Sequence, residues 1–173
     1  MEITSEQIKT VGEILKQLEP GLLPEEIFYQ IARVFVTPIV EIVPIILEDG
    51  KVKVLLLERP ADDPFWGGML HTPGTIVLST DKEGSIESAF ERILNNELAG
   101  ETTIHPPILV GYENHQGNRG RELALIHWVE MKDATSKVGT YYDIDNLPVR
   151  IVDTQVKFIK KAVDHYKNYK SNS

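Results

Sequence analysis

An arginine and a carboxylate in one predicted helix are the residues of this chain best placed to do chemistry. The helix is expected over residues 85–98 and carries Arg92 and Glu97. Between the turn Pro73-Gly74 and this helix lie a short extended run and a polar loop. Such a strand, loop and helix can hold a divalent cation against a phosphate-bearing ligand, because Mg²⁺ and Mn²⁺ favour carboxylate and carbonyl oxygens.

The face of the helix that carries Glu97 limits how many carboxylates the site could use. Positions i, i+3 and i+4 of a helix share a face, and here they are Ile93, Asn96 and Glu97. A single acid remains where three would form a metal cluster. The alternative interpretation is structural: Ile93 belongs to an apolar stripe that packs on the core, and Glu97 is a surface residue of the last turn.

Further polar residues that could bind a ligand lie outside this helix. His71 ionises near neutral pH when unperturbed, so it could contact a phosphate or act as a base. The segment 113–122 is expected to be a polar loop whose two arginines could grip a diphosphate bidentately; a solvated hairpin loop has the same composition. The loop residues expected to contact a ligand are Glu113, His115, Gln116, Arg119 and Arg121.

Acidic residues in two other places could add to a site. Asp62 and Asp63 adjoin Phe65 and Trp66, which together offer carboxylates and a stacking surface. Glu130 and Asp133 follow a predicted strand and could replace missing metal ligands.

Composition restricts the classes of function. The net charge of −8 argues against a nucleic-acid backbone as the partner. The absence of cysteine excludes disulfides and thiolate zinc sites and suits a reducing, cytoplasmic location. The first residues alternate acids with apolar side chains, unlike a signal peptide, and no apolar run is long enough for a membrane span.

The elements that would position these residues follow from periodicity and turn signals. Two N-terminal helices are expected as an extension over 1–36, followed by one domain over 37–170 and a disordered tail over 171–173. Strands, a helix, further strands and a closing helix predict a mixed α/β (α+β) sandwich. The expected ranges are helices over 4–18, 24–33, 85–98 and 153–169, and strands over 40–47, 52–57, 75–78, 104–112, 123–131 and 141–144.

The segment from Pro73 to Gly100 resembles the Nudix box, a glycine and a spacer followed by a helix with the pattern R-E-U-x-E-E-x-G. The matching residues are Pro73-Gly74, the helix entry Ser85 to Ala89, Arg92, Leu94 and Glu97. Ile93 and Asn96 replace the first two glutamates, the spacer is longer, and Gly100 comes one position late, after Ala99. The resemblance implies a Nudix-type α/β/α sandwich and Mg²⁺- or Mn²⁺-assisted hydrolysis of a nucleoside-diphosphate-linked small molecule.

The helix string AFERILNNELAG is similar to that of GDP-mannose mannosyl hydrolases, whose box also keeps a single Glu. This resemblance implies that Glu97 and the Gly74 carbonyl hold the metal and that Arg59 contacts the phosphates. We expect Arg92 to orient the carboxylate of Glu97 through a charge-assisted hydrogen bond. The match is partial: Ile76 replaces a second arginine, and Thr135-Ser136 fall where that branch has a Gln-His pair.

Two other functions stay open from the sequence. The missing glutamates favour a catalytically inactive Nudix-like module that binds a nucleotide-type ligand or a protein. An apolar face on the first helix that its own domain leaves uncovered would favour a homodimer through the N-terminal helices.

Overall fold

The longest apolar segment of the chain forms the central strand of a sheet in the computed structural model, which describes residues 3–83 and 85–172. This strand, β1 (Thr37–Glu48), is buried from Ile39 to Ile46. A tight turn connects it to β2 (Lys51–Glu58), and Asp49 and Gly50 have φ angles of 52° and 75°. Positive φ at both central residues matches the twist of a two-residue hairpin. The predicted hairpin is confirmed.

The sheet is mixed. Its strand order is β3-β2-β1-β6-β5, with β4 pairing β1 and β7 pairing β2. In the described part of the chain, β1 and β6 pair in parallel and the other named strand pairs are antiparallel. The remaining strands are β3 (Leu70–His71), β4 (Gly74–Ile76), β5 (Ile108–Gln116), β6 (Arg121–Glu130) and β7 (Thr140–Asp143).

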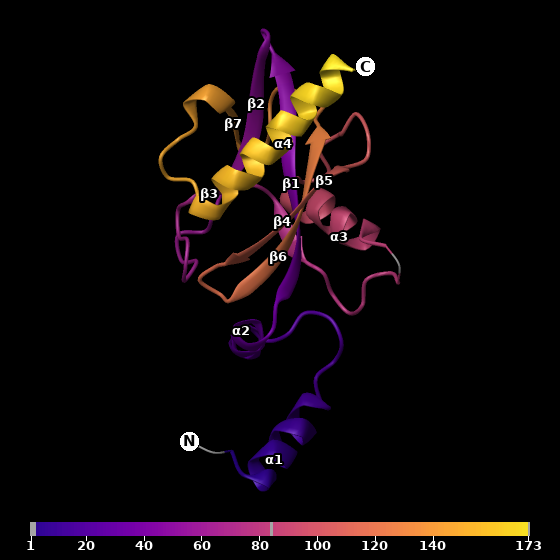
Figure 1. Ribbon diagram of the computed structural model, residues 1–173, viewed down its shortest axis with the longest axis vertical. Helices are drawn as coiled ribbons and strands as arrows, with labels where there is room; N and C mark the ends of the chain where they lie inside the picture. Colours follow the sequence, from indigo (N-terminus) through magenta and orange to yellow (C-terminus); the bar gives the residue numbers. More distant parts are fainter. Residues whose placement is uncertain (1–2, 84, 173) are drawn as a thin grey trace.

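Helices cover both faces of the sheet, so the predicted α/β/α sandwich is confirmed (Figure 1). Helix α4 (Asp153–Ser171) buries Phe158, Ile159 and Val163 against one face. On the other face, α3 (Glu87–Arg92) and the π-helical turn η1 (Ile93–Glu97) bury Ala89 and Ile93. A 3₁₀ turn, η2 (Ile144–Asn146), follows β7. Among the described residues, every helix falls short of the length and apolarity needed to span a bilayer.

Several of the expected element boundaries differ from those observed. The helix over 85–98 is a short α-helix followed by a π-helical turn. Most of the expected polar loop over 113–122 is strand, because β5 and β6 pair as far as Gln116 and Arg121. Helix α4 continues to Ser171, so the expected tail over 171–173 is reduced to Asn172, the C-cap, and Ser173, which lies outside the described residues.

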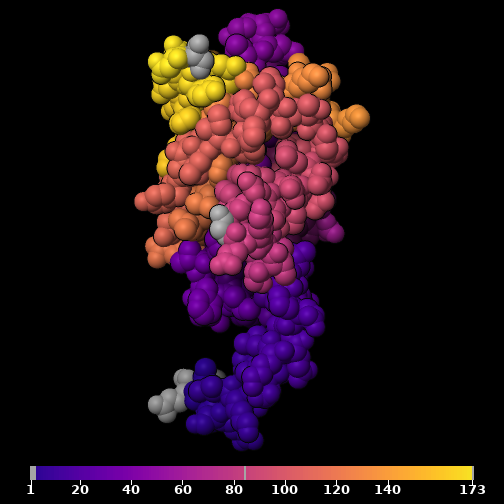
Figure 2. Space-filling view, turned by 90° about the vertical axis from the view of Figure 1, so that its right-hand side faces the viewer, coloured from indigo at the N-terminus to yellow at the C-terminus, as the bar shows by residue number. Residues whose placement is uncertain are grey.

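The N-terminal extension consists of the two expected helices, α1 (Ser5–Leu15) and α2 (Glu25–Val34). Thr4 caps α1, accepting a hydrogen bond from the Gln7 N–H at 3.2 Å and donating its own N–H to the Gln7 side chain at 2.9 Å. Both helices lie beyond one end of the sandwich (Figures 1 and 2). Helix α1 has no buried residue, while α2 buries Ala32.

Candidate functional site

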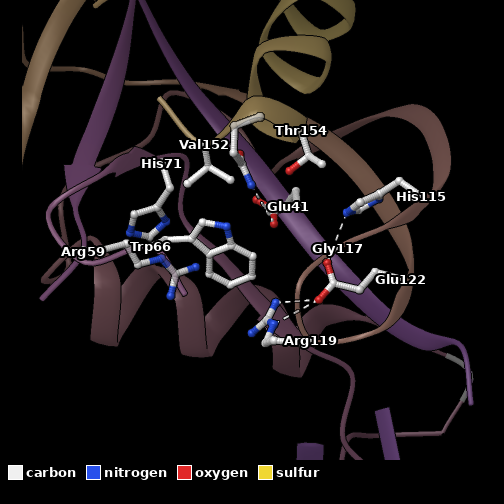
Figure 3. A pocket seen from close by; sticks show the side chains of 11 residues that line it. Glu41, Arg59, Trp66, His71, His115, Gly117, Arg119, Glu122, Val152 and Thr154 are labelled. Carbon is white, nitrogen blue, oxygen red and sulfur yellow. Dashed lines mark hydrogen bonds and ion pairs between the residues drawn. The ribbon is translucent and has the colours of Figure 1, made fainter. Parts of the chain in front are cut away.

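A cavity opens where β1, the β5–β6 hairpin and the start of α4 meet (Figure 3). Its volume is about 20 Å³, which accommodates roughly one water molecule. A larger ligand would therefore contact the charged groups at the mouth. The lining residues are Glu41, Arg59, Trp66, His71, His115, Gly117, Arg119, Glu122, Val152, Thr154 and Gln155.

Two arginines flank a tryptophan at this mouth. The guanidinium carbons of Arg59 and Arg119 lie 5.5 Å and 5.1 Å from the ring centroid of Trp66, within cation–π range. Asp63 accepts the backbone N–H groups of Phe65 and Trp66, each at 2.9 Å, and so fixes the loop that presents the ring. Burial opposes ionisation of Asp63, but these donors and Arg59 hold its pKa below the ordinary value.

Glu122 orders the other polar groups of the hairpin. Its carboxylate lies 2.7 Å from Nη2 of Arg119 and 3.2 Å from Nε2 of His115. Burial raises the pKa of Glu122, but His115 and Arg119 outweigh it, and the net pKa is lowered. Within the described residues, His115 Nδ1 and Arg59 Nε are buried without a hydrogen-bond partner. The site therefore has spare hydrogen-bonding capacity.

A second carboxylate, Glu41, is buried in the centre of the sheet. It falls between Ile39 and Val43 on the face of β1 that packs on α4, because side chains alternate along a strand. Glu41 Oε2 accepts the Thr72 hydroxyl at 3.0 Å and Oε1 accepts Nε2 of Gln155 at 3.2 Å. Burial nevertheless dominates and raises the pKa of Glu41 to about 8. Its carboxyl is therefore mostly protonated at neutral pH.

Glu97 points to the Pro73-Gly74 turn. Its Oε2 accepts the Gly74 N–H at 3.2 Å, and burial raises the pKa of Glu97 to about 7 although Gly74 and Arg59 lower it. On the other side of Gly74, a methyl group added to its Cα would lie 2.7 Å from the Glu41 carboxyl group. Only glycine fits between the two carboxylates.

A π-helical turn ends the helix that carries Glu97. The Leu98 N–H donates to the Ile93 carbonyl at 3.0 Å, an i→i+5 bond that adds one residue to the turn. If the segment is compared with the Nudix box that it resembles, this additional residue would place Gly100 one position late. Ile93 is fully buried, as the apolar stripe predicted, whereas Glu97 lies partly buried at the turn and is not a surface residue of the last turn.

Arg92 does not have the expected partner. It donates to the Ile76 carbonyl at 2.8 Å and pairs with both oxygens of Asp81, and this pairing lowers the pKa of Asp81. The expected hydrogen bond from Arg92 to Glu97 is therefore replaced by a connection between α3 and the loop after β4. Arg92 can position the helix but does not touch the carboxylate.

The structure brings together some of the expected ligand-binding residues and separates others. Arg59, His71, His115 and Arg119 line the same cavity. Glu113 instead lies 2.9 Å from Lys161 Nζ, on α4, and Arg121 and Gln116 are exposed. Glu113 and Arg121 are thus outside this cavity.

His71 differs from the expected titratable loop residue. It is only 7% exposed, and its Nδ1 lies 2.7 Å from the Thr72 carbonyl oxygen, which requires a proton on Nδ1 because a carbonyl only accepts. Burial and the nearby Arg59 lower the pKa of His71 to about 4. His71 is therefore neutral at physiological pH.

Glu130 is not a replacement metal ligand. Its carboxylate accepts the Tyr166 hydroxyl at 3.1 Å and pairs with Lys170 at 2.8 Å, toward the C-terminal end of α4. It contributes to an ion pair between β6 and the last helix.

Glu41, Glu122 and Gln155 were not identified from the sequence as site residues. For Glu41 a signal existed, because it is an acid within a strongly apolar strand, at a position whose alternate neighbours are aliphatic. Glu122 and Gln155 reach the site only through strand pairing and the docking of α4, which local patterns do not encode.

The donors for a metal ion are fewer than in a complete Nudix box. Across residues 3–83 and 85–172, no group of three or more His, Cys, Asp or Glu side chains is close enough to hold an ion. Glu41 and Glu97 both approach Gly74, and their carboxylate oxygens are of the kind Mg²⁺ prefers.

Solved structures of similar architecture identify the fold. A MutT/Nudix family protein from Listeria innocua matches with a TM-score of 0.64 and 19% identity, over 79% of this chain and 98% of that one. The Nudix domain of NrtR from Shewanella oneidensis, solved with ADP-ribose, matches with a TM-score of 0.59 and 19% identity, over 95% and 99%. The Ap4A hydrolase of C. elegans matches with a TM-score of 0.56 and 13% identity, over 77% and 99%.

NrtR has also been solved with a 27mer DNA, and this chain covers 62% of that protein, with a TM-score of 0.57 and 19% identity. No protein-family model and no curated sequence matches the chain. At these identities the similarity concerns architecture: the chain has the Nudix fold.

Proposed function

We propose that this protein hydrolyses a nucleoside-diphosphate-linked small molecule with the assistance of Mg²⁺. The observation that carries the proposal is the contact between Glu97 and Gly74, which keeps the one retained box carboxylate at the Pro-Gly turn. This carboxylate is also close enough to Arg59 for the guanidinium to lower its pKa. A carboxylate that senses the charge of Arg59, which lines the cavity, suits chemistry on a phosphate ester.

The arginines would bind the diphosphate. Arg59 Nε has no partner within the described chain, and Arg119 can offer its remaining donors while Glu122 holds it in place. Guanidinium groups match phosphate oxygens in a bidentate geometry. Trp66 fixes the spacing between the two guanidinium groups by contacting both.

Glu97 and the Gly74 carbonyl would hold the cation, with Glu41 as the neighbouring carboxyl group. When bound, the ion would act as a Lewis acid that stabilises charge developing on the substrate oxygens. Glu41, protonated at neutral pH, adds no negative charge until a cation favours its ionisation.

The experiment is a product screen with nucleoside-diphosphate sugars, dinucleotides and nucleoside triphosphates, with Mg²⁺ or Mn²⁺, on the wild type and Glu97→Gln. We expect the substitution to lower kcat/KM by at least about 100-fold, because it removes the retained metal carboxylate. Glu91→Gln, an exposed residue of α3, is the matched control and should be unaffected. Equal activity in wild type and Glu97→Gln would reject the metal assignment.

The second candidate is an inactive module that binds the same class of ligand. This function is favoured by the small number of carboxylates available to bind a metal ion. Ile93, which stands where the Nudix box has a glutamate, is a core residue and cannot be a ligand. In that case the same compounds would bind with micromolar or tighter affinity and remain intact over hours with either metal. Calorimetry beside the product screen separates the two functions.

A further inference from the structure

The N-terminal extension packs against both chain segments that carry the arginines of the cavity. One segment is the β5–β6 hairpin, where the Ala32 carbonyl oxygen of α2 would lie 2.1 Å from a methyl group added at Gly120. The other is the loop 59–69, the aromatic loop, where Tyr29 of the same helix contacts the ring of Phe65. Helix α2 therefore touches the two parts of the domain that present the guanidinium groups.

A series of ring contacts leads from α2 to these guanidinium groups. The ring centroids of Tyr29 and Phe65 lie 5.2 Å apart at an interplanar angle of 85°, the edge-to-face arrangement that aromatic pairs favour. The rings of Phe65 and Trp66 follow at 5.6 Å. Trp66 in turn lies between Arg59 and Arg119 and contacts both (Figure 3). The extension thus supplies the first ring of a series that ends at the two arginines.

Tyr29 is itself held in place on α2. Its hydroxyl donates to Glu25, one turn earlier in the helix, and this hydrogen bond and partial burial raise the pKa of Tyr29 to about 12. The charge of Arg119 is close enough to act on the same pKa in the opposite direction. A fixed neighbour restricts the Phe65 ring, so less conformational entropy is lost when a ligand binds to a loop already in its bound arrangement.

We propose that Tyr29 is a positioning residue for diphosphate binding, which acts through Phe65 on the place of the Trp66 ring. The inference rests on the proposed function, because the two guanidinium groups that contact Trp66 are those that would bind the diphosphate. Tyr29 lies outside the lining of the cavity, so its effect is indirect. The ring of Tyr29 has this role, and its hydroxyl does not.

Calorimetry with inorganic pyrophosphate and Mg²⁺ on the full chain tests this inference. We expect Tyr29→Leu to weaken pyrophosphate binding about 2- to 10-fold, the range that corresponds to the loss of one aromatic pair. Tyr29→Phe keeps the ring and should bind like the wild type. The matched control is Phe35→Leu, at the exposed C-cap of the same helix, which should leave the affinity unchanged. Thermal unfolding verifies that each variant is folded.

A double-mutant cycle tests whether Tyr29 acts through Phe65. Phe65→Leu should weaken pyrophosphate binding to at least the same extent as Tyr29→Leu. Adding Tyr29→Leu to Phe65→Leu should cause no further loss, because the contact is already absent. Losses that multiply in the double variant would contradict the proposed route.

The fluorescence of Trp66 provides a second readout. The chain has two tryptophans, and Trp128 is fully buried whereas Trp66 is partly exposed, so acrylamide should quench mainly Trp66. We expect quenching to increase in Tyr29→Leu and to stay at the wild-type level in Tyr29→Phe. A purely structural role of Tyr29 would lower the unfolding temperature without changing this signal in the folded protein.

The possible outcomes separate this inference from the proposed function. Pyrophosphate binding with equal affinity in wild type and Tyr29→Leu would overturn the inference and leave the diphosphate site standing. Equal losses in Tyr29→Leu and Tyr29→Phe would also overturn it, because the hydroxyl would then be the group that matters. An absence of pyrophosphate binding in the wild type would reject the diphosphate site, and with it any role of Tyr29 in binding.

Discussion

Two arginines of one hairpin occupy very different surroundings. Arg119 contacts Trp66 and Glu122 at the cavity, whereas Arg121, in the first position of β6, is exposed. The sequence predicted the same ligand-binding role for both. Their positions in the fold separate them.

Arg119→Gln should weaken pyrophosphate binding about 10-fold, because it removes a charged hydrogen-bond donor from the mouth of the cavity. Arg121→Gln should change the affinity by less than about twofold. Calorimetry at fixed ionic strength measures both, and thermal unfolding verifies that both variants fold. Equal losses would mean that only the overall charge of the hairpin matters.

Glu41 makes folding stability depend on pH. Its pKa rises from 4.5 to about 8 on folding, so the folded chain keeps a proton that the unfolded chain loses. Stability is therefore highest below pH 4.5 with respect to this group and falls as pH rises toward 8. The slope is about 1.4 kcal/mol per pH unit inside that window.

Glu41→Gln removes the contribution of Glu41 and leaves that of Glu97, whose pKa is also raised, to about 7. In buffer with a chelator, the unfolding free energy of the variant should increase relative to wild type as pH rises from 4.5 to 8, measured by urea denaturation. His71, whose pKa is lowered to about 4, contributes in the opposite direction between pH 4 and 6.5, but it does so equally in both proteins and cancels. A difference that stays constant with pH would show that Glu41 is ionised in the folded protein.

At the scale of elements, α2 is attached to the hairpin by close backbone packing. A methyl group added at Gly120, where φ is 146°, would lie 2.1 Å from the carbonyl oxygen of Ala32. No side chain can occupy that position while α2 keeps its place. Since Tyr29 of the same helix contacts Phe65, this packing also affects the aromatic loop.

Gly120→Ala should release α2, and trypsin should then cleave after the exposed Arg33 several times faster. The matched control is Gly111→Ala in β5, which has a similar φ of 152° and no atom within 4 Å of the added methyl group. It introduces the same backbone strain without the collision. Equal cleavage rates in the two variants would contradict the packing argument.

At the scale of the whole molecule, the N-terminal extension leaves an apolar surface uncovered. Ile8, Val11 and Ile14 of α1 are 61%, 53% and 51% exposed. A cavity of about 400 Å³ lies between α1 and α2, lined mainly by aliphatic side chains. This is the feature that the homodimer alternative required, and large exposed apolar patches commonly mark interfaces.

We expect the chain to dimerise through this exposed apolar surface. A stable interface typically buries about 800 Å² on each partner. Sedimentation equilibrium should give twice the chain mass of 19.5 kDa for wild type and the chain mass for Val11→Glu combined with Ile14→Lys. Lys9→Glu, on the opposite side of α1, is the control and should remain dimeric. A monomeric wild type at the highest soluble concentration would reject the dimer.

Local patterns were sufficient for much of the architecture. Apolar runs, turn residues and helical stripes predicted the β1–β2 hairpin, the extension and the closing helix, because these depend on contacts between residues near in sequence. They failed at the segment 113–122, where the polarity of the side chains concealed strand pairing, and at the π-helical turn before Gly100.

The sequence by itself determined most of the elements, the fold class and the position of Glu97 near the end of its helix. Only the tertiary structure decided which polar groups meet: Glu41 beside Gly74, Arg119 beside Trp66, and Arg92 with Asp81 in place of Glu97. These contacts join segments far apart in the chain, and their formation depends on strand register and helix docking. Local sequence encodes the propensity of each segment, whereas the meeting of distant charges is set by how the buried apolar faces pack.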